Sequence, residues 1–261
     1  MAGSVTPFVS PELYDRGIQV IGANDNFFAE SVAEAALAYM IIALRKIKQT
    51  ILLLNEKKAD GWYKIKEQKG LFDRQVGIVS YGAIAKHLVK ILQPFRCNIK
   101  VYSTHPIAAE ELEKYNMTQV SLEEIFSTCD VISLHTAWNS KTEKMYNKRL
   151  LSMIKDGAVL VNTARGRIID EEALIEELKT GRFYAALDVT WDEPCPSDNP
   201  LYDMENVLIM PHNGGPTRDR CKYIASSLID EVYDWLEYGK PLTNIIPKER
   251  GLSMTVNMPK K

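Results

Sequence analysis

Short apolar runs recur along the chain from residue 75 onwards, separated by segments with the spacing of amphipathic helices. Each run is four to five residues long, rich in β-branched side chains, and does not alternate with polar residues. Such runs are typical of strands that are buried on both faces of a parallel sheet. They cover residues 76–79, 99–102, 131–134, 158–161, 185–189 and 207–210. The alternation of strand and helix predicts an α/β fold with a doubly wound parallel sheet.

A long helical pattern precedes these runs. It begins at Asn24 or Asp25, either of which can cap a helix, and continues to about Leu54. Its residues 35–44 carry no charge on any side, and a helix that is apolar all round is expected to be buried. Further along, Ser121 opens a capping box that predicts the start of a shorter helix.

Composition narrows the class of protein. The chain has 261 residues, 46% hydrophobic and 25% charged, and its net charge is −2 without a long run of either sign. This pattern excludes an electrostatic surface for nucleic acid or an anionic membrane, and the longest uncharged apolar stretch is half the length of a membrane span. The four cysteines, Cys97, Cys129, Cys195 and Cys221, lack CxxC spacing. We therefore expect a cytoplasmic protein with reduced thiols and without a metal site.

The first strand–helix junction has the position of a dinucleotide-binding glycine turn. As a GxGxxG motif it is degenerate, because Ser80 and Ala85 replace the first and third glycines and only Gly82 is retained. A plain tight turn remains the alternative interpretation. If the site is real, the pyrophosphate contacts are Tyr81, Gly82, Ala83 and Ile84 at the helix N-terminus.

The second strand ends without the acidic residue that normally binds the ribose hydroxyls and disfavours NADP. The residues there are Ser103, Thr104 and His105, each able to bond a phosphate. We therefore expect NAD or NADP as the cofactor, with NADP tolerated.

Several further sequence blocks stand out downstream, at residues 130–135, 160–166, 187–189, 193–194 and 211–215. Together they resemble the NAD-binding half of the D-isomer-specific 2-hydroxyacid dehydrogenases, and residues 16–18 and 31–34 resemble the family's linker. The resemblance implies a Rossmann-type dinucleotide-binding domain and a small-molecule 2-keto or 2-hydroxy acid as the substrate.

Carried over to this chain, the family's catalytic residues are Arg165, Glu193 and His212. Hydride transfer requires the substrate oxygen to gain or lose a proton, and a histidine with a pKa of about 6.5 can do both. The resemblance implies that Glu193 orients the imidazole, as the acid of a catalytic triad does. It also implies that Arg165 presents its planar fork to the substrate carboxylate.

The resemblance also implies contacts to cofactor and substrate. Cofactor contacts fall on His135, Thr136, Thr163, Ala164, Asp188 and Gly214, and substrate-carboxylate contacts fall on Gly3, Ser4 and Val5. Ala137 departs from the family's usual proline, which loosens the assignment of His135 and Thr136. For Asp188, which in the family faces the nicotinamide carboxamide, a capping or surface acid is the alternative.

We interpret residues 1–23 as a remnant of a flavodoxin-like substrate lobe with its linker, residues 24–239 as the dinucleotide-binding domain, and residues 240–261 as a segment returning toward that lobe. Because most of the substrate lobe has no counterpart in the sequence, we expect this chain to bind cofactor with little turnover. The apolar helix predicts a homodimer. Two alternatives are a corepressor-like protein that senses dinucleotide without catalysis, and a cofactor-free dimerisation scaffold.

Overall fold

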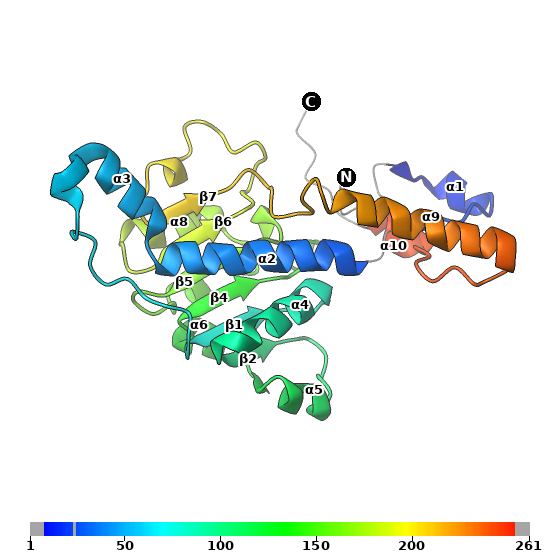
Figure 1. The fold of residues 1–261 in the computed structure, drawn as a ribbon, viewed down its shortest axis with the longest axis horizontal. Coiled ribbons are helices and arrows are strands. Elements are labelled where there is room, and N and C mark those ends of the chain that lie inside the picture. The colour runs from blue at the N-terminus through cyan, green and yellow to red at the C-terminus, as the bar shows by residue number, and fades with distance from the viewer. Residues whose placement is uncertain (1–7, 23–24, 254–261) are drawn as a thin grey trace.

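The computed structural model describes residues 8–22 and 25–253 (Figure 1). Its centre is a seven-stranded sheet in the order β3-β2-β1-β4-β5-β6-β7, with every neighbouring pair parallel. The strands are β1 (Gln75–Val79), β2 (Asn98–Tyr102), β3 (Met117–Gln119), β4 (Val131–Leu134), β5 (Val159–Asn162), β6 (Tyr184–Leu187) and β7 (Val207–Ile209). This order is that of a doubly wound dinucleotide-binding fold.

All six apolar runs are strands, with ends shifted by at most two residues, and the predicted α/β class is confirmed. Strand β3 is not among the predicted strands. That strand is three residues long, lies at the sheet edge and buries only Met117, so it has no run of apolar residues to reveal it.

Helices cover both faces of the sheet, and successive strand residues face opposite layers. Val131 packs in the layer with α2 (Asp25–Leu44) and α4 (Ala83–Leu92), whereas Ile132 packs with α6 (Leu122–Thr128), α7 (Lys148–Leu151) and α8 (Glu171–Lys179). The short helix α5 (Ala109–Lys114) connects β2 to β3. As predicted, Ser121 caps α6, its hydroxyl accepting a hydrogen bond from Glu124 N at 3.2 Å.

The prediction of one helix to about Leu54 is wrong. The chain turns after α2 because Lys46 has a left-handed backbone, with φ of 52°, and a separate helix α3 (Ile47–Lys57) follows. α2 is buried along one face, whereas α3 has no buried residue and projects away from the sheet (Figure 1). A short 3₁₀ turn, Lys58–Gly61, ends α3.

Within α2, the segment Phe27–Leu44 is long and apolar enough to cross a membrane, judged by length and composition alone. Core helices satisfy the same criterion. Ala33, Ala36 and Met40 are fully buried against α4 and the sheet, so packing within this fold accounts for the apolar character of that face.

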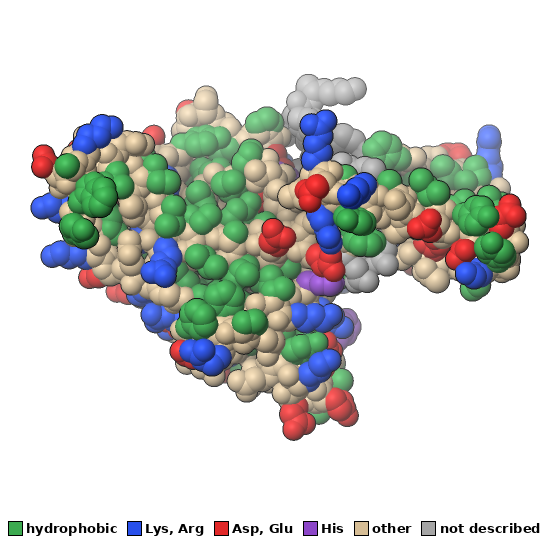
Figure 2. Space-filling model, in the orientation of Figure 1, with side chains coloured by type: hydrophobic (Ala, Val, Ile, Leu, Met, Phe, Trp, Pro, Cys, Tyr) green, Lys and Arg blue, Asp and Glu red, His purple; other side chains and the backbone are tan. Residues whose placement is uncertain are grey.

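The remaining α-helices lie at one end of the sheet (Figure 1). They are α1 (Pro11–Asp15), α9 (Cys221–Tyr238) and α10 (Lys248–Ser253). Helix α1 contacts α10 and α9 contacts α2, and an antiparallel bridge pairs Ile21 with Ile245. α9 extends away from the sheet and carries exposed apolar side chains, as α3 does (Figure 2). The division at residues 23 and 239 remains a prediction.

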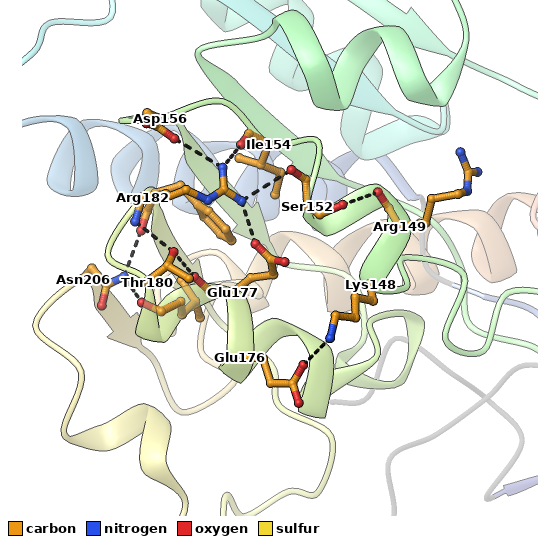
Figure 3. A network of polar contacts seen from close by, with 12 residues as sticks. Lys148, Arg149, Ser152, Ile154, Asp156, Glu176, Glu177, Thr180, Arg182 and Asn206 are labelled. Atoms are coloured by element: carbon orange, nitrogen blue, oxygen red, sulfur yellow. Dashed lines mark hydrogen bonds and ion pairs between the residues drawn. The ribbon is translucent and has the colours of Figure 1, made fainter.

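Ion pairs tie α7 and α8 to the amino end of β6 (Figure 3). Arg182 donates to Glu177 at 2.6 Å and to Asp156 at 3.3 Å, while Lys148 donates to Glu176 at 2.8 Å. The loops that follow the carboxyl ends of the strands lie at the opposite edge, so this network stabilises the scaffold rather than the candidate site.

Candidate active site

Three loops at the carboxyl edge of the sheet carry the predicted catalytic residues. Arg165 follows β5, Glu193 follows β6 and His212 follows β7, and these strands are neighbours in the sheet. Gly166 lets the first two loops meet, because a Cβ on it would lie 1.8 Å from the carbonyl oxygen of Thr190. Parallel topology and one glycine therefore bring together residues that are far apart in the sequence.

His212 and Glu193 form a direct pair, with His212 Nδ1 2.7 Å from Glu193 Oε2. The Glu193 side chain is 17% exposed and the His212 side chain 44%. The hydrogen bond that His212 donates to Glu193 raises the pKa of His212, and burial of the imidazole partly offsets this shift. Because Nδ1 is engaged by the carboxylate, Nε2 is the atom left to exchange a proton with a substrate.

Arg165 lies next to this pair. Burial lowers the pKa of the Arg165 guanidinium, and the negative charge of Glu193 opposes that shift. The buried side chain of Asn162 shapes the loop, since its Nδ2 donates to Arg165 O at 2.9 Å and its Oδ1 accepts from Ala164 N at 3.0 Å. Asn162 is not among the predicted site residues, although an amide side chain at a strand end is a signal for such a role.

Asp188 is 2% exposed, and its carboxylate holds the loop that carries His212. Its Oδ1 accepts from the backbone N–H groups of Asn213 and Gly214, each at 3.1 Å, and from Tyr39 Oη at 3.0 Å. The interpretation of Asp188 as a surface acid is wrong. The cofactor contact that the resemblance implies for Asp188 remains a prediction.

The glycine turn leads directly from β1 into α4. Ser80 stands at the first glycine position with a φ of 73°, and Gly82 is the N-cap of α4 without a side chain to cap the helix. A Cβ on Gly82 would meet no atom within 4 Å, so open space adjoins the helix N-terminus. Ala83 and Ile84 form the first turn of α4, where backbone N–H groups can bind an anion.

Side chains around this turn contact one another. The Ser80 hydroxyl lies 2.8 Å from Thr136 Oγ1, which is 2.5 Å from Tyr146 Oη, and Tyr81 Oη donates to Glu111 at 3.0 Å. The turn and the end of β4 are thus joined. Thr136 is buried by this network and not free at the surface.

Two predicted cofactor contacts have buried polar atoms without a hydrogen-bond partner in the described part of the chain. They are both ring nitrogens of His135, after β4, and the hydroxyl of Thr163, after β5. Burial lowers the pKa of His135 to about 4, so its ring is neutral at neutral pH. Orphaned polar atoms at this edge, beside an open helix N-terminus, fit a polar ligand such as a dinucleotide.

The other predicted contacts are more exposed or lie outside the described residues. At the end of β2, Ser103 Oγ accepts a hydrogen bond from His105 N at 3.2 Å. Gly3, Ser4 and Val5 lie outside the described residues. Within the described ranges, no group of three or more His, Cys, Asp or Glu side chains is arranged to hold a metal ion.

The fold and the site define a doubly wound nucleotide-binding domain with a histidine–carboxylate pair and a neighbouring arginine. Residues 37–214 match the D-isomer specific 2-hydroxyacid dehydrogenase, NAD binding domain, and the chain belongs to this family.

The chain is similar to named relatives in other organisms. It is 33% identical to a D-3-phosphoglycerate dehydrogenase of Methanocaldococcus jannaschii over 90% of this chain and 45% of that protein. It is also 33% identical to a hydroxypyruvate reductase of Thermotoga maritima over 84% of this chain and 70% of the relative. The chain therefore spans less than half of the first of these proteins.

Among solved structures, an acyclic imino acid reductase in complex with NADPH and D-Arg superposes with a TM-score of 0.74. That protein is 28% identical, and the match covers 90% of this chain and 73% of the other.

Proposed function

We propose that this chain is the cofactor-binding and proton-transferring part of an NAD(P)-dependent 2-hydroxyacid dehydrogenase that reduces a 2-keto acid or oxidises a 2-hydroxy acid. The observation that carries the proposal is the 2.7 Å contact between His212 Nδ1 and Glu193 Oε2 beside half-buried Arg165. A dinucleotide-binding domain needs no such pair to bind its ligand, whereas proton transfer does.

In this mechanism, Arg165 binds the substrate carboxylate and orients the keto group toward His212. Protonated His212 donates from Nε2 to the carbonyl oxygen during reduction, and neutral His212 accepts the same proton during oxidation. Glu193 stabilises the imidazolium and fixes the ring through Nδ1. A bound nicotinamide dinucleotide supplies or accepts the hydride at the carbon that bears this oxygen.

For the cofactor, we propose contacts from Tyr81 to Ile84 at the pyrophosphate and from His135 and Thr163 elsewhere along the edge. Either NAD or NADP is accommodated, because Ser103 has no carboxylate to repel a 2′-phosphate. The NADPH complex of the imino acid reductase supports this tolerance.

We further propose that the 261-residue chain turns over slowly by itself. The His212 side chain is 44% exposed, so the described residues leave the proton carrier open to water. Positioning of the reactants can lower the activation free energy by about 7–11 kcal/mol, and a site open to water loses part of this effect. Slow turnover is compatible with intact dinucleotide binding.

A homodimer is part of the proposal. α3 exposes the apolar side chains of Ile51 and Leu52, and exposed apolar side chains of this kind suit an isologous contact. We place the protein in the cytoplasm, which the four unpaired cysteines support.

The test measures NADH and NADPH binding to the purified chain by fluorescence, then their consumption with glyoxylate, hydroxypyruvate, pyruvate or phenylpyruvate. We expect binding, and slow consumption that His212→Gln abolishes without loss of dinucleotide affinity. Absence of dinucleotide binding would contradict the proposal. Binding without turnover, even after fusion to a substrate lobe of the family, would favour the sensing function.

A further inference from the structure

The loop that carries His212 is linked to α2 through the buried carboxylate of Asp188. Tyr39, on α2, donates its phenol proton to Asp188 Oδ1 at 3.0 Å. The same carboxylate accepts Gly214 N at 3.1 and 3.0 Å through its two oxygens and Asn213 N at 3.1 Å. Tyr39 is 5% exposed and Asp188 2%, so water does not compete for these contacts.

Gly214 fits into a slot between Asp188 and α2. A Cβ at this position would lie 2.7 Å from Asp188 Oδ2 and 3.3 Å from the Cβ of Ala35. A side chain at position 214 would therefore collide with the Asp188 carboxylate and crowd Ala35 of α2, so glycine lets the loop backbone approach both closely.

The loop also needs restraint. His212 has a φ of 53°, in the left-handed region that non-glycine residues occupy only when their surroundings enforce it. A backbone hydrogen bond from His212 N to Asp188 O, at 2.8 Å, restrains the backbone at His212 itself. The Asp188 carboxylate restrains the next two residues, Asn213 and Gly214, provided that the carboxylate itself is held in place.

We propose that Tyr39 is a positioning residue for His212, acting through Asp188 and the backbone of Asn213 and Gly214. A buried carboxylate must keep its donors, because each lost hydrogen bond leaves charge uncompensated. Phenylalanine at position 39 would fill the same space and leave Asp188 one donor short. This inference rests on the proposed function only in taking His212 as the proton carrier.

The test compares Tyr39→Phe with the unaltered chain by amide hydrogen exchange and by NMR titration of His212. We expect the Asn213 and Gly214 amides to exchange at least about tenfold faster. We also expect the pKa of His212 to fall toward its usual value, because a looser loop weakens the bond to Glu193. Tyr184→Phe is the matched control, since it removes a phenol hydroxyl at the amino end of β6, away from the loop.

Unchanged Asn213 and Gly214 exchange together with an unchanged His212 titration in Tyr39→Phe would overturn the proposal. If that variant does not fold, Gly214→Ala applies the same test from the other side, because its methyl group pushes the loop away from Asp188. It should produce the same two changes while Val161, in the sheet core, keeps its protection. Both readouts stand without bound cofactor, so a failure of dinucleotide binding would count against the proposed function alone.

Discussion

His212 Nδ1 lies 2.7 Å from Glu193 Oε2, across two loops that belong to adjacent strands. This contact raises the pKa of His212 above its usual value of 6.5. The stability that the pair contributes is therefore fully present below about pH 6.5 and is lost as the pH rises through the higher folded-state pKa.

The first prediction concerns that pKa. NMR titration of the His212 ring should give a midpoint above 6.5, and Glu193→Gln should lower the midpoint because the charged acceptor is gone. Glu176→Gln is the control, since its carboxylate pairs with Lys148 and contacts neither His212 nor Arg165 in the ion pairs of the described residues. A His212 midpoint that does not respond to Glu193→Gln would show that the pair does not form in solution.

The second prediction concerns the glycine turn. Gly82→Val should fold, because a Cβ there meets no atom within 4 Å and the φ of Gly82 is −90°. The branched side chain would occupy the space in which a pyrophosphate approaches the N-terminus of α4, so dinucleotide affinity should fall by at least about tenfold, or 1.4 kcal/mol. Gly70→Val, also in open space, should bind like the unaltered chain. Equal dinucleotide affinity of both variants would show that the pyrophosphate does not bind at this turn.

The third prediction concerns cofactor preference. NADH and NADPH should have dissociation constants within about tenfold of each other, which corresponds to 1.4 kcal/mol. Ser103→Asp should shift the preference toward NADH, because a carboxylate at the end of β2 accepts the ribose hydroxyl and repels a 2′-phosphate. Fluorescence titration of the unaltered chain and of Ser103→Asp with NADH and NADPH measures these dissociation constants. NADH bound more than tenfold tighter by the unaltered chain would refute NADP tolerance.

The fourth prediction concerns oligomeric state. Sedimentation should show a homodimer at micromolar concentration, and a double substitution of Ile51→Glu and Leu52→Glu should shift it to monomer. Both side chains are about half exposed on α3, at 54% and 46%, so their replacement costs little folding energy. Ile91→Glu on α4, 36% exposed, is the control. A monomeric unaltered chain would contradict the dimer.

The fifth prediction concerns the scaffold. Arg182→Met should lower the free energy of unfolding by about 1–3 kcal/mol, because Glu177, whose side chain is 13% exposed, loses its charged donor. Arg149→Met should cost less than about 1 kcal/mol, since Arg149 and its partner Glu123 are 64% and 46% exposed. Urea denaturation of the two variants measures both values. Equal losses would show that burial does not distinguish these ion pairs.

The sequence by itself determined six of the seven strands, because strands inside a parallel sheet are mainly apolar and six such runs are present. It also located Arg165, Glu193 and His212 at strand ends, through motifs that occupy short stretches of chain. Parallel topology then requires that residues after neighbouring strands meet at one edge.

Only the tertiary structure decided which side chains act on one another across that edge. In the sequence, Tyr39 cannot be distinguished from the other apolar positions of the helix. Its hydrogen bond with Asp188 joins residues that are 149 positions apart. The sequence also did not predict the turn at Lys46, because the helical spacing of apolar residues continues through it. The turn separates α2, which packs against the sheet, from α3, which has no buried residue. Local patterns encode which face of an element is buried, but a hydrogen bond between distant residues depends on how the elements pack, which no single segment of the sequence specifies.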